Sequence, residues 1–293
     1  MHWDDLRFFL AAARSKTMAT AARRLNVDAT TVSRRIERLS TSLNTNLFDS
    51  GPDGMTLTDS GKRLFQDAEE VERSILNASD LLTGARGRLE GSVRISLSEG
   101  FAAWVVARHL GEFRELHPDI SLEIVTTNGF LNPSKREADL AVMLGRPTKG
   151  LLVTRKLTDY ALGLYASRGY LAKYGQPGNV DELRQRVLIG YIPDFIYAEE
   201  LRYLSEIHDD LTPTLSSSSI NIQLEMTRAG LGVSVLPKFM TTLDDELRPV
   251  LPDIQIDRSF WVVVHRDLTR VARVRAVIDW LDGLGRNVYS AGK

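Results

Sequence analysis

The sequence predicts an α/β protein in three parts: a small helical domain that ends in a hairpin, a long connecting helix, and a larger α/β domain. Three observations support this prediction. The first sixty residues hold three segments with helical spacing of apolar residues, followed by two short β-like runs. Apolar residues then follow a heptad-like seam between residues 64 and 82. From residue 91 onward, short β-like runs alternate with helical patterns, as in α/β units.

The composition is that of an ordinary globular chain and excludes several kinds of chemistry. With 293 residues and 43% hydrophobic content, the chain can bury substantial cores. No apolar run approaches the ~18 residues of a membrane span, and the N-terminus lacks a basic signal-peptide start, so we expect a cytoplasmic protein without membrane contact. There is no cysteine, and the five histidines show no ligand-like pairing. We therefore expect neither a metal nor a cofactor.

Three helices are predicted at the start of the chain, each with an apolar face. The apolar positions are Leu6, Phe9, Leu10 and Ala13 in the first helix, Met18, Ala21, Ala22 and Leu25 in the second, and Val32, Ile36, Leu39 and Leu43 in the third. Small alanines in the second helix let a neighbouring helix approach closely. Asp28 stands where a residue that caps the third helix is expected.

The exposed face of the third helix carries hydroxyl and guanidinium groups, which suit base edges and phosphates. Residues 16 to 38 hold six basic and two acidic side chains, although the net charge of the whole chain is −1. The base-reading candidates are Thr30, Thr31 and Arg34, and the phosphate-binding candidates are Ser33, Arg35 and Arg38. This pattern predicts a helix-turn-helix that binds double-stranded DNA. A solvated Arg-rich helix in an unrelated bundle would show the same spacing.

Two short strands, around residues 47–48 and 55–58, follow the third helix and are joined by Gly51-Pro52-Asp53-Gly54, which predicts a wing. The segment LRFFLAAARSKTMATAARRLNVDATTVSRRIERLSTSLNTNLFDSGPDGMTLTDSG resembles the winged helix-turn-helix of LysR-type transcriptional regulators along more than fifty residues. Two features depart from that family. Asp28-Ala29-Thr30 stands where the family usually has Ser-Gln-Pro, so base readout should differ. Asp49 and Asp53 make an acidic wing, so its phosphate contacts should be weaker or absent.

The connecting helix, 61–90 with its hinge, carries apolar residues spaced four and three apart. The seam consists of Leu64, Ala68, Val71, Ile75, Ala78 and Leu82. A surface helix packed on its own domain would show the same spacing. The family resemblance implies that this helix pairs two protomers, and that the dimers assemble further into a tetramer. A dimer presents two recognition helices to two half-sites.

The remaining chain, 91–293, also resembles the LysR family. GSVRISLSEGF, ADLAVMLGRP and EMTRAGLGVSVLPKFM are similar to its effector domain, which is built like a periplasmic binding protein from two α/β lobes around a small-molecule cleft. This implies lobe I at about 91–160 plus 268–293 and lobe II at about 161–267. Residues 1–60 would then form the DNA-binding domain.

The resemblance implies effector contacts where strands lead into helices. The candidates are Ser98, Glu99, Thr127, Asn128, Ser218 and Ser219, with Arg146, Phe195 and Tyr197 as further possibilities. Helix capping alone would also account for Ser98 and Ser219. A carboxylate at position 99 would repel an acidic effector and suit an amine or a hydroxylated molecule. Replacing Glu99 with Gln should then reduce the response to the native effector.

An enzyme is the competing class of function. The sequence lacks a G-x-G-x-x-G after a strand, a phosphate-binding G-x-x-x-x-G-K-[ST] loop and an H-E-x-x-H helix. Ser98 is preceded by Ser96 rather than by the glycine of a nucleophile elbow. The sequence therefore predicts an effector-responsive regulator that is not an enzyme. The alternative is a DNA-binding head on a constitutive oligomerisation platform that binds no ligand.

Overall fold

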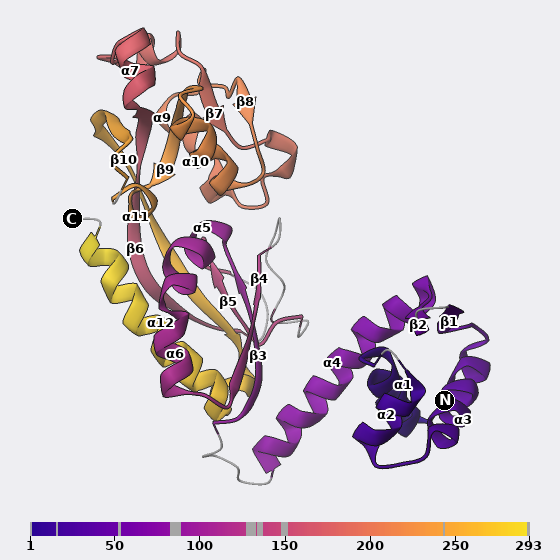
Figure 1. Cartoon of the computed structure of the whole chain (residues 1–293). Helices are drawn as coiled ribbons and strands as arrows, with labels where there is room; N and C mark the ends of the chain where they lie inside the picture. The colour runs from indigo at the N-terminus through magenta and orange to yellow at the C-terminus, as the bar shows by residue number, and fades with distance from the viewer. Residues whose placement is uncertain are drawn as a thin grey trace. The chain divides into compact units, whose positions relative to one another are not determined.

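The computed structural model describes residues 2–15, 17–51, 54–82, 89–126, 133, 137–147, 152–242 and 244–291. The chain forms two compact units, Met1–Gly84 and Ala85–Lys293 (Figure 1). Among the described helices, none is long and apolar enough to cross a membrane.

The first unit contains the three predicted helices and the hairpin. The elements are α1 (Trp3–Ala13), α2 (Met18–Leu25), α3 (Ala29–Leu43), β1 (Phe48–Gly51) and β2 (Gly54–Leu57). The hairpin is antiparallel, with Phe48 opposite Leu57. α2 and α3 end on Asn26 and Asn44 in the left-handed conformation, which closes a helix and turns the chain.

One prediction about α3 holds only in part, and another is wrong. Asp28 occupies the N-cap position, but its side chain makes no capping hydrogen bond. Leu43 was expected in the buried stripe and is 37% exposed, because α3 ends there. The rest of the stripe is confirmed, since Val32, Ile36 and Leu39 are buried against the other helices.

The long helix α4 (Asp59–Leu82) begins inside the first unit. Ala68 is only 2% exposed and packs into the core that α1 and α3 form, so this residue of the expected pairing seam is covered by its own domain. Leu64 packs against the same core, and Val71 is half-buried. Ile75 is 62% exposed, and the side chain of Leu82 lies outside the described residues. Among the side chains of α4 that the structure describes, Ile75 is the exposed apolar one, and it lies in the later part of the helix.

The second unit is organised by one mixed sheet with the strand order β4-β3-β5-β10-β6-β9-β7-β8. The strands are β3 (Gly91–Leu97), β4 (Ile120–Val125), β5 (Leu140–Met143), β6 (Leu152–Ser167), β7 (Leu188–Gly190), β8 (Leu215–Ser216), β9 (Val233–Pro237) and β10 (Leu247–His265). β6 and β10 are long antiparallel partners that run from one lobe into the other (Figure 1). Both are much longer than the short β-like runs that the sequence predicted for this part of the chain.

The lobe boundary differs from the expected one. Residues Trp261 to Val264 of β10 pair with β5, which belongs to the first lobe. The chain therefore returns to lobe I within β10, before the expected boundary at 268.

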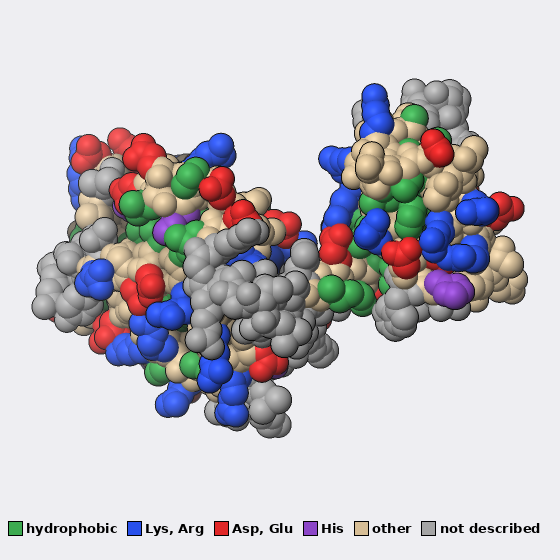
Figure 2. All heavy atoms as spheres, turned by 90° about the horizontal axis from the view of Figure 1, so that it is seen from below, with side chains coloured by type: hydrophobic (Ala, Val, Ile, Leu, Met, Phe, Trp, Pro, Cys, Tyr) green, Lys and Arg blue, Asp and Glu red, His purple; other side chains and the backbone are tan. Residues whose placement is uncertain are grey.

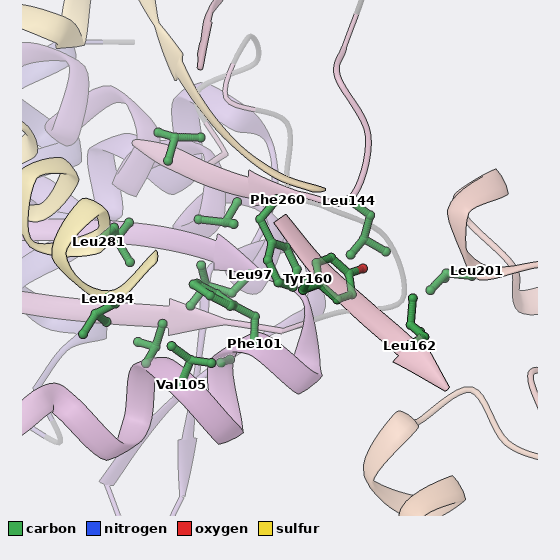
Figure 3. Close-up of a cluster of buried hydrophobic side chains, with 14 of the residues drawn as sticks. Leu97, Phe101, Val105, Leu144, Tyr160, Leu162, Leu201, Phe260, Leu281 and Leu284 are labelled. Atoms are coloured by element: carbon green, nitrogen blue, oxygen red, sulfur yellow. The ribbon is translucent and has the colours of Figure 1, made fainter. Parts of the chain in front are cut away.

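Helices cover the sheet in both lobes. Lobe I carries α5 (Glu99–Phe101), α6 (Leu110–Leu116) and α12 (Ala272–Ala291), and lobe II carries α7 (Arg168–Tyr174), α8 (Val180–Leu183), α9 (Tyr203–Ile207), α10 (Ile220–Arg228) and α11 (Lys238–Thr241). A π-helical turn, Ala102–Val106, follows α5 directly. The apolar face of α12 packs on the sheet, where Leu281 and Leu284 lie in the same core as Leu97 and Val105 (Figure 3).

Candidate functional site

The outer face of α3 is the first candidate site. Thr30, Ser33 and Arg34 are exposed and Thr31 is half-buried. Among the described residues, no acidic side chain forms an ion pair with Arg34. Figure 2 shows Lys and Arg side chains prominent on the visible face of this smaller unit, at the right of the view. The helix thus presents a free guanidinium between hydroxyl groups.

Arg35 and Arg38, on the same helix, are engaged within the protein. Asp5 of α1 is 1% exposed and accepts from Arg35 Nη1 at 3.0 Å and from Arg38 Nε at 2.8 Å. Arg38 Nη2 also donates to Asp5 Oδ1. Burial raises the pKa of the Asp5 carboxyl, but the hydrogen bonds and charges of the two arginines outweigh it and leave that pKa lowered.

The cluster of Asp5, Arg35 and Arg38 holds α3 against α1. The Arg35 guanidinium also lies 5.0 Å from the centre of the Phe8 ring and 3.3 Å from Asp4 Oδ2. Sequence reasoning missed this role, because Asp5 looks like an ordinary acidic residue in the first turn of a helix.

The hairpin carries Asp49 on an exposed position of β1, so the described part of the wing is acidic as expected. Asp53 lies outside the described residues.

The second candidate site is a cavity of about 400 Å³ in the second unit, between the two lobes. Its walls combine aromatic side chains with hydroxyl groups and one carboxylate. The lining residues are Ser98, Glu99, Gly100, Phe101, Thr126, Leu144, Tyr160, Tyr191, Tyr197, Leu201, Tyr203, Ser218, Ser219, Ile220, Pro237, Phe239 and Phe260. A pocket of this size and character suits a small organic molecule.

Seven of the residues that line the cavity are aromatic. Tyr160 stacks on Phe260 with ring centres 4.2 Å apart, and Figure 3 shows both beside Leu144, with Leu201 across from them. Burial raises the pKa of the Tyr160, Tyr191 and Tyr203 phenols. Burial and the nearby Glu99 charge raise the pKa of Tyr197 to about 12. These phenols therefore stay neutral at physiological pH.

Glu99, the first residue of α5, reaches the N-terminus of α10. Its carboxylate accepts from Ser219 Oγ at 2.8 Å, from the Ile220 backbone N–H at 3.1 Å and from Asn221 Nδ2 at 3.0 Å. Ser219 also caps α10, since its side chain accepts from the Ile222 N–H at 3.2 Å. The Glu99 carboxylate thus has three donors within the protein.

The structure brings only some of the sequence-predicted cleft residues together. Ser98, Glu99, Ser218 and Ser219 line the cavity, as does Tyr197. Arg146 does not: its guanidinium lies 5.5 Å from the centre of the Trp261 ring. Phe195 is 52% exposed and also lies outside the lining.

Thr127 and Asn128 fall outside the described residues, although the preceding Thr126 lines the cavity. Sequence reasoning missed the aromatic wall of Tyr160, Tyr191, Tyr203, Phe239 and Phe260. Aromatic residues within strands and short helices carry the same signal whether they fill a core or border a cavity.

Comparison with known proteins covers both units. The family described as "Bacterial regulatory helix-turn-helix protein, lysR family" matches residues 3–62, and the "LysR substrate binding domain" matches residues 86–285. The HTH-type transcriptional regulator CrgA of Neisseria meningitidis serogroup C (strain 8013) is 25% identical over 292 residues, which is 97% of this chain and 98% of that protein.

Solved structures show the same fold. The structure of CrgA from Neisseria meningitidis matches with a TM-score of 0.61 and 24% identity, over 97% of this chain and 99% of that one. The full-length Vibrio cholerae virulence activator AphB matches with a TM-score of 0.58 and 23% identity, over the same shares of the two chains.

Proposed function

The chain belongs to the LysR family of transcriptional regulators, and from this premise we propose how its two units read DNA and sense a small molecule. It is a transcriptional regulator with a helix-turn-helix DNA-binding domain and an effector-binding domain, and not an enzyme. The residues that make the contacts, the assembly and the class of effector are our proposals.

For DNA readout, the proposal assigns base contacts to Thr30, Thr31 and Arg34 and a phosphate contact to Ser33. A guanidinium without an internal partner can take guanine O6 and N7 bidentately, and threonine can bond a base or touch a thymine methyl. The exposed, unpaired Arg34 on α3 is the observation that carries this assignment.

Arg35 and Arg38 receive a different assignment from the one their positions suggested. Their hydrogen bonds to Asp5 hold α3 in place against α1. The Arg38 side chain is still 46% exposed, so its remaining N–H groups can also contact a phosphate.

The proposed assembly is a dimer, and then a tetramer, with the later part of α4 as the dimer contact. Ile75 is the evidence for a contact at this part of the helix, because it is apolar and 62% exposed. A dimer places two α3 helices on two DNA half-sites. A DNA-binding regulator of this kind would act in the cytoplasm.

The proposed effector site is the 400 Å³ cavity between the lobes. An effector that binds one arrangement of the lobes more tightly would shift the population toward it, and so alter how the protomers sit on DNA. The cavity favours this reading over a ligand-free oligomerisation platform.

The proposed function is tested by fluorescence anisotropy of the full chain on the duplex upstream of its own gene and on a scrambled duplex, across a salt series. We expect tight binding to the first duplex and weak, steeply salt-dependent binding to the second. Absence of binding to both duplexes, even at low salt, would contradict the DNA-binding assignment.

A further inference from the structure

A carboxylate of lobe I reaches lobe II beside the cavity. Glu99 belongs to α5 in lobe I, and its three donors, Ser219, Ile220 and Asn221, lie at the start of α10 in lobe II (Figure 1). Each carboxylate oxygen is used: Oε1 accepts from Ser219 and Asn221, and Oε2 accepts from Ile220. Charge-assisted hydrogen bonds of this kind are stronger than neutral ones.

The donors around this carboxylate are themselves held in place from lobe I. Trp104 Nε1 donates to Asn221 Oδ1 at 2.8 Å, which orients the amide so that its nitrogen faces Glu99. Beside it, Gly100 approaches α10 closely, because a Cβ at that position would lie 3.4 Å from Ile220 Cγ2. Packing between the lobes therefore fixes the position of the Glu99 side chain.

The N-terminus of a nine-residue helix is a favourable place for an anion. In this protein the Glu99 carboxylate already fills that place. A ligand acid group would have to displace it and would meet its negative charge at short range. Among the described residues that line the cavity there is no Lys or Arg to offset that repulsion.

We propose that Glu99 is a built-in anion of the cleft, which joins the lobes at the start of α10 and excludes acidic effectors. This inference rests on the proposed function of the cavity as an effector site. The effector would be an uncharged molecule with an aromatic or hydroxylated body, facing the neutral phenols and the serine hydroxyls. The three donors already use most of the hydrogen-bonding capacity of the Glu99 carboxylate, so an effector amine would gain little from a direct contact with it.

The experiment removes the Glu99 carboxylate by mutation and then supplies a carboxylate from solution. In the full chain, Glu99→Ala keeps the Cβ and removes a fragment equivalent to acetate, leaving three donors without their acceptor. We expect the melting temperature of the second unit to fall by about 5 °C. About 50 mM sodium acetate should restore at least half of that loss, because a ligand that binds the folded state stabilises it. Sodium chloride at the same ionic strength and uncharged acetamide should not.

Two comparisons make the result specific. The wild-type protein should not respond to acetate, since its anion position is filled. Glu112→Ala, which removes an exposed glutamate from α6 in the same lobe, should leave both the melting temperature and the acetate response unchanged. Benzoate should rescue Glu99→Ala at a lower concentration than acetate, because its ring can enter the aromatic part of the cavity.

The inference is overturned if acetate stabilises the wild type as much as Glu99→Ala, or if no anion rescues the variant. If Glu99→Ala does not fold, Glu99→Gln decides: an amide cannot accept from all three donors, so a melting temperature equal to that of wild type would refute the role of Glu99. DNA binding by the same variants distinguishes a failure of this inference from a failure of the proposed function. Retained DNA binding without rescue contradicts this inference alone, whereas rescue in a protein that never binds DNA contradicts the proposed function.

Discussion

Replacement of Asp5 by Asn tests how α3 is held in the orientation that reads DNA. The carboxylate is 1% exposed and accepts charge-assisted hydrogen bonds from Arg35 at 3.0 Å and from Arg38 at 2.8 Å. The amide keeps one acceptor oxygen but loses the charge, and its NH₂ group faces the guanidinium groups. Hydrogen bonds to charged groups each contribute about 1.5–3 kcal/mol.

The expected cost is smaller than the sum of those bonds. Both arginines are partly exposed, so water can solvate them once the carboxylate is gone. We expect Asp5→Asn to reduce the free energy of unfolding of the first unit by about 2 kcal/mol. For a unit of this size, that corresponds to a fall in Tm of roughly 10 °C.

Differential scanning calorimetry of the full chain at fixed protein concentration measures this change, with Asp4→Asn as the matched control. Asp4 is 53% exposed and, among the described residues, forms an ion pair with Arg35 at 3.3 Å, so its replacement should cost less than about 0.5 kcal/mol. Equal effects of the two substitutions at pH 7 would refute the reasoning.

The pH dependence provides a second check on Asp5. Burial raises the pKa of Asp5, but the hydrogen bonds and charges of the two arginines lower it by more. The pKa in the folded protein is therefore below the ordinary value of 3.8. The stabilisation is therefore fully present above the unfolded pKa and is lost as the pH falls through the lowered folded value. The difference in stability between wild type and Asp5→Asn should persist at pH 5 and shrink below about pH 4.

Two further predictions concern α4. Gly61→Ala should destabilise the first unit by about 1–3 kcal/mol in the same calorimetric assay, because a Cβ at position 61 would collide with the Leu47 carbonyl oxygen. An unchanged Tm would contradict the packing at the start of α4. Ile75→Glu should weaken dimerisation about 100-fold in sedimentation equilibrium without lowering the Tm of the first unit, since two copies of an exposed apolar side chain lose their burial. An unchanged dimer would place the contact elsewhere on the chain.

The sequence could predict the first unit well, because its signals are local. Helical spacing located α1, α2 and α3, and the burial of Val32, Ile36 and Leu39 follows directly from that spacing. It could not predict the ion pairs of α3. Asp5 lies about thirty residues away in sequence, and only the packing of α1 on α3 brings its carboxylate to Arg35 and Arg38. The burial of Ala68 against its own domain is one of the two alternatives that the spacing of this helix left open.

The sequence could likewise predict some residues of the cleft but not others. Residues at strand-to-helix junctions, such as Ser98 and Ser219, could be predicted because the chain must turn there and expose backbone N–H groups. The aromatic wall could not, since Tyr160 and Phe260 lie within the long strands β6 and β10. Glu99 was recognised as unusual, but its partners on α10 depend on how one lobe meets the other, which residue spacing does not encode.

The central claim is that the outer face of α3, centred on Arg34, reads DNA sequence. The most direct test compares Arg34→Ala with Arg114→Ala, which removes an exposed arginine from α6 in the second unit, in anisotropy titrations on the specific and the scrambled duplex. We expect Arg34→Ala to lose about 10- to 100-fold in affinity for the specific duplex and much less for the scrambled one, as the loss of a base contact would cause. Arg114→Ala should match the wild type. Equal losses on both duplexes would make Arg34 a phosphate contact, and no loss on either would contradict the claim.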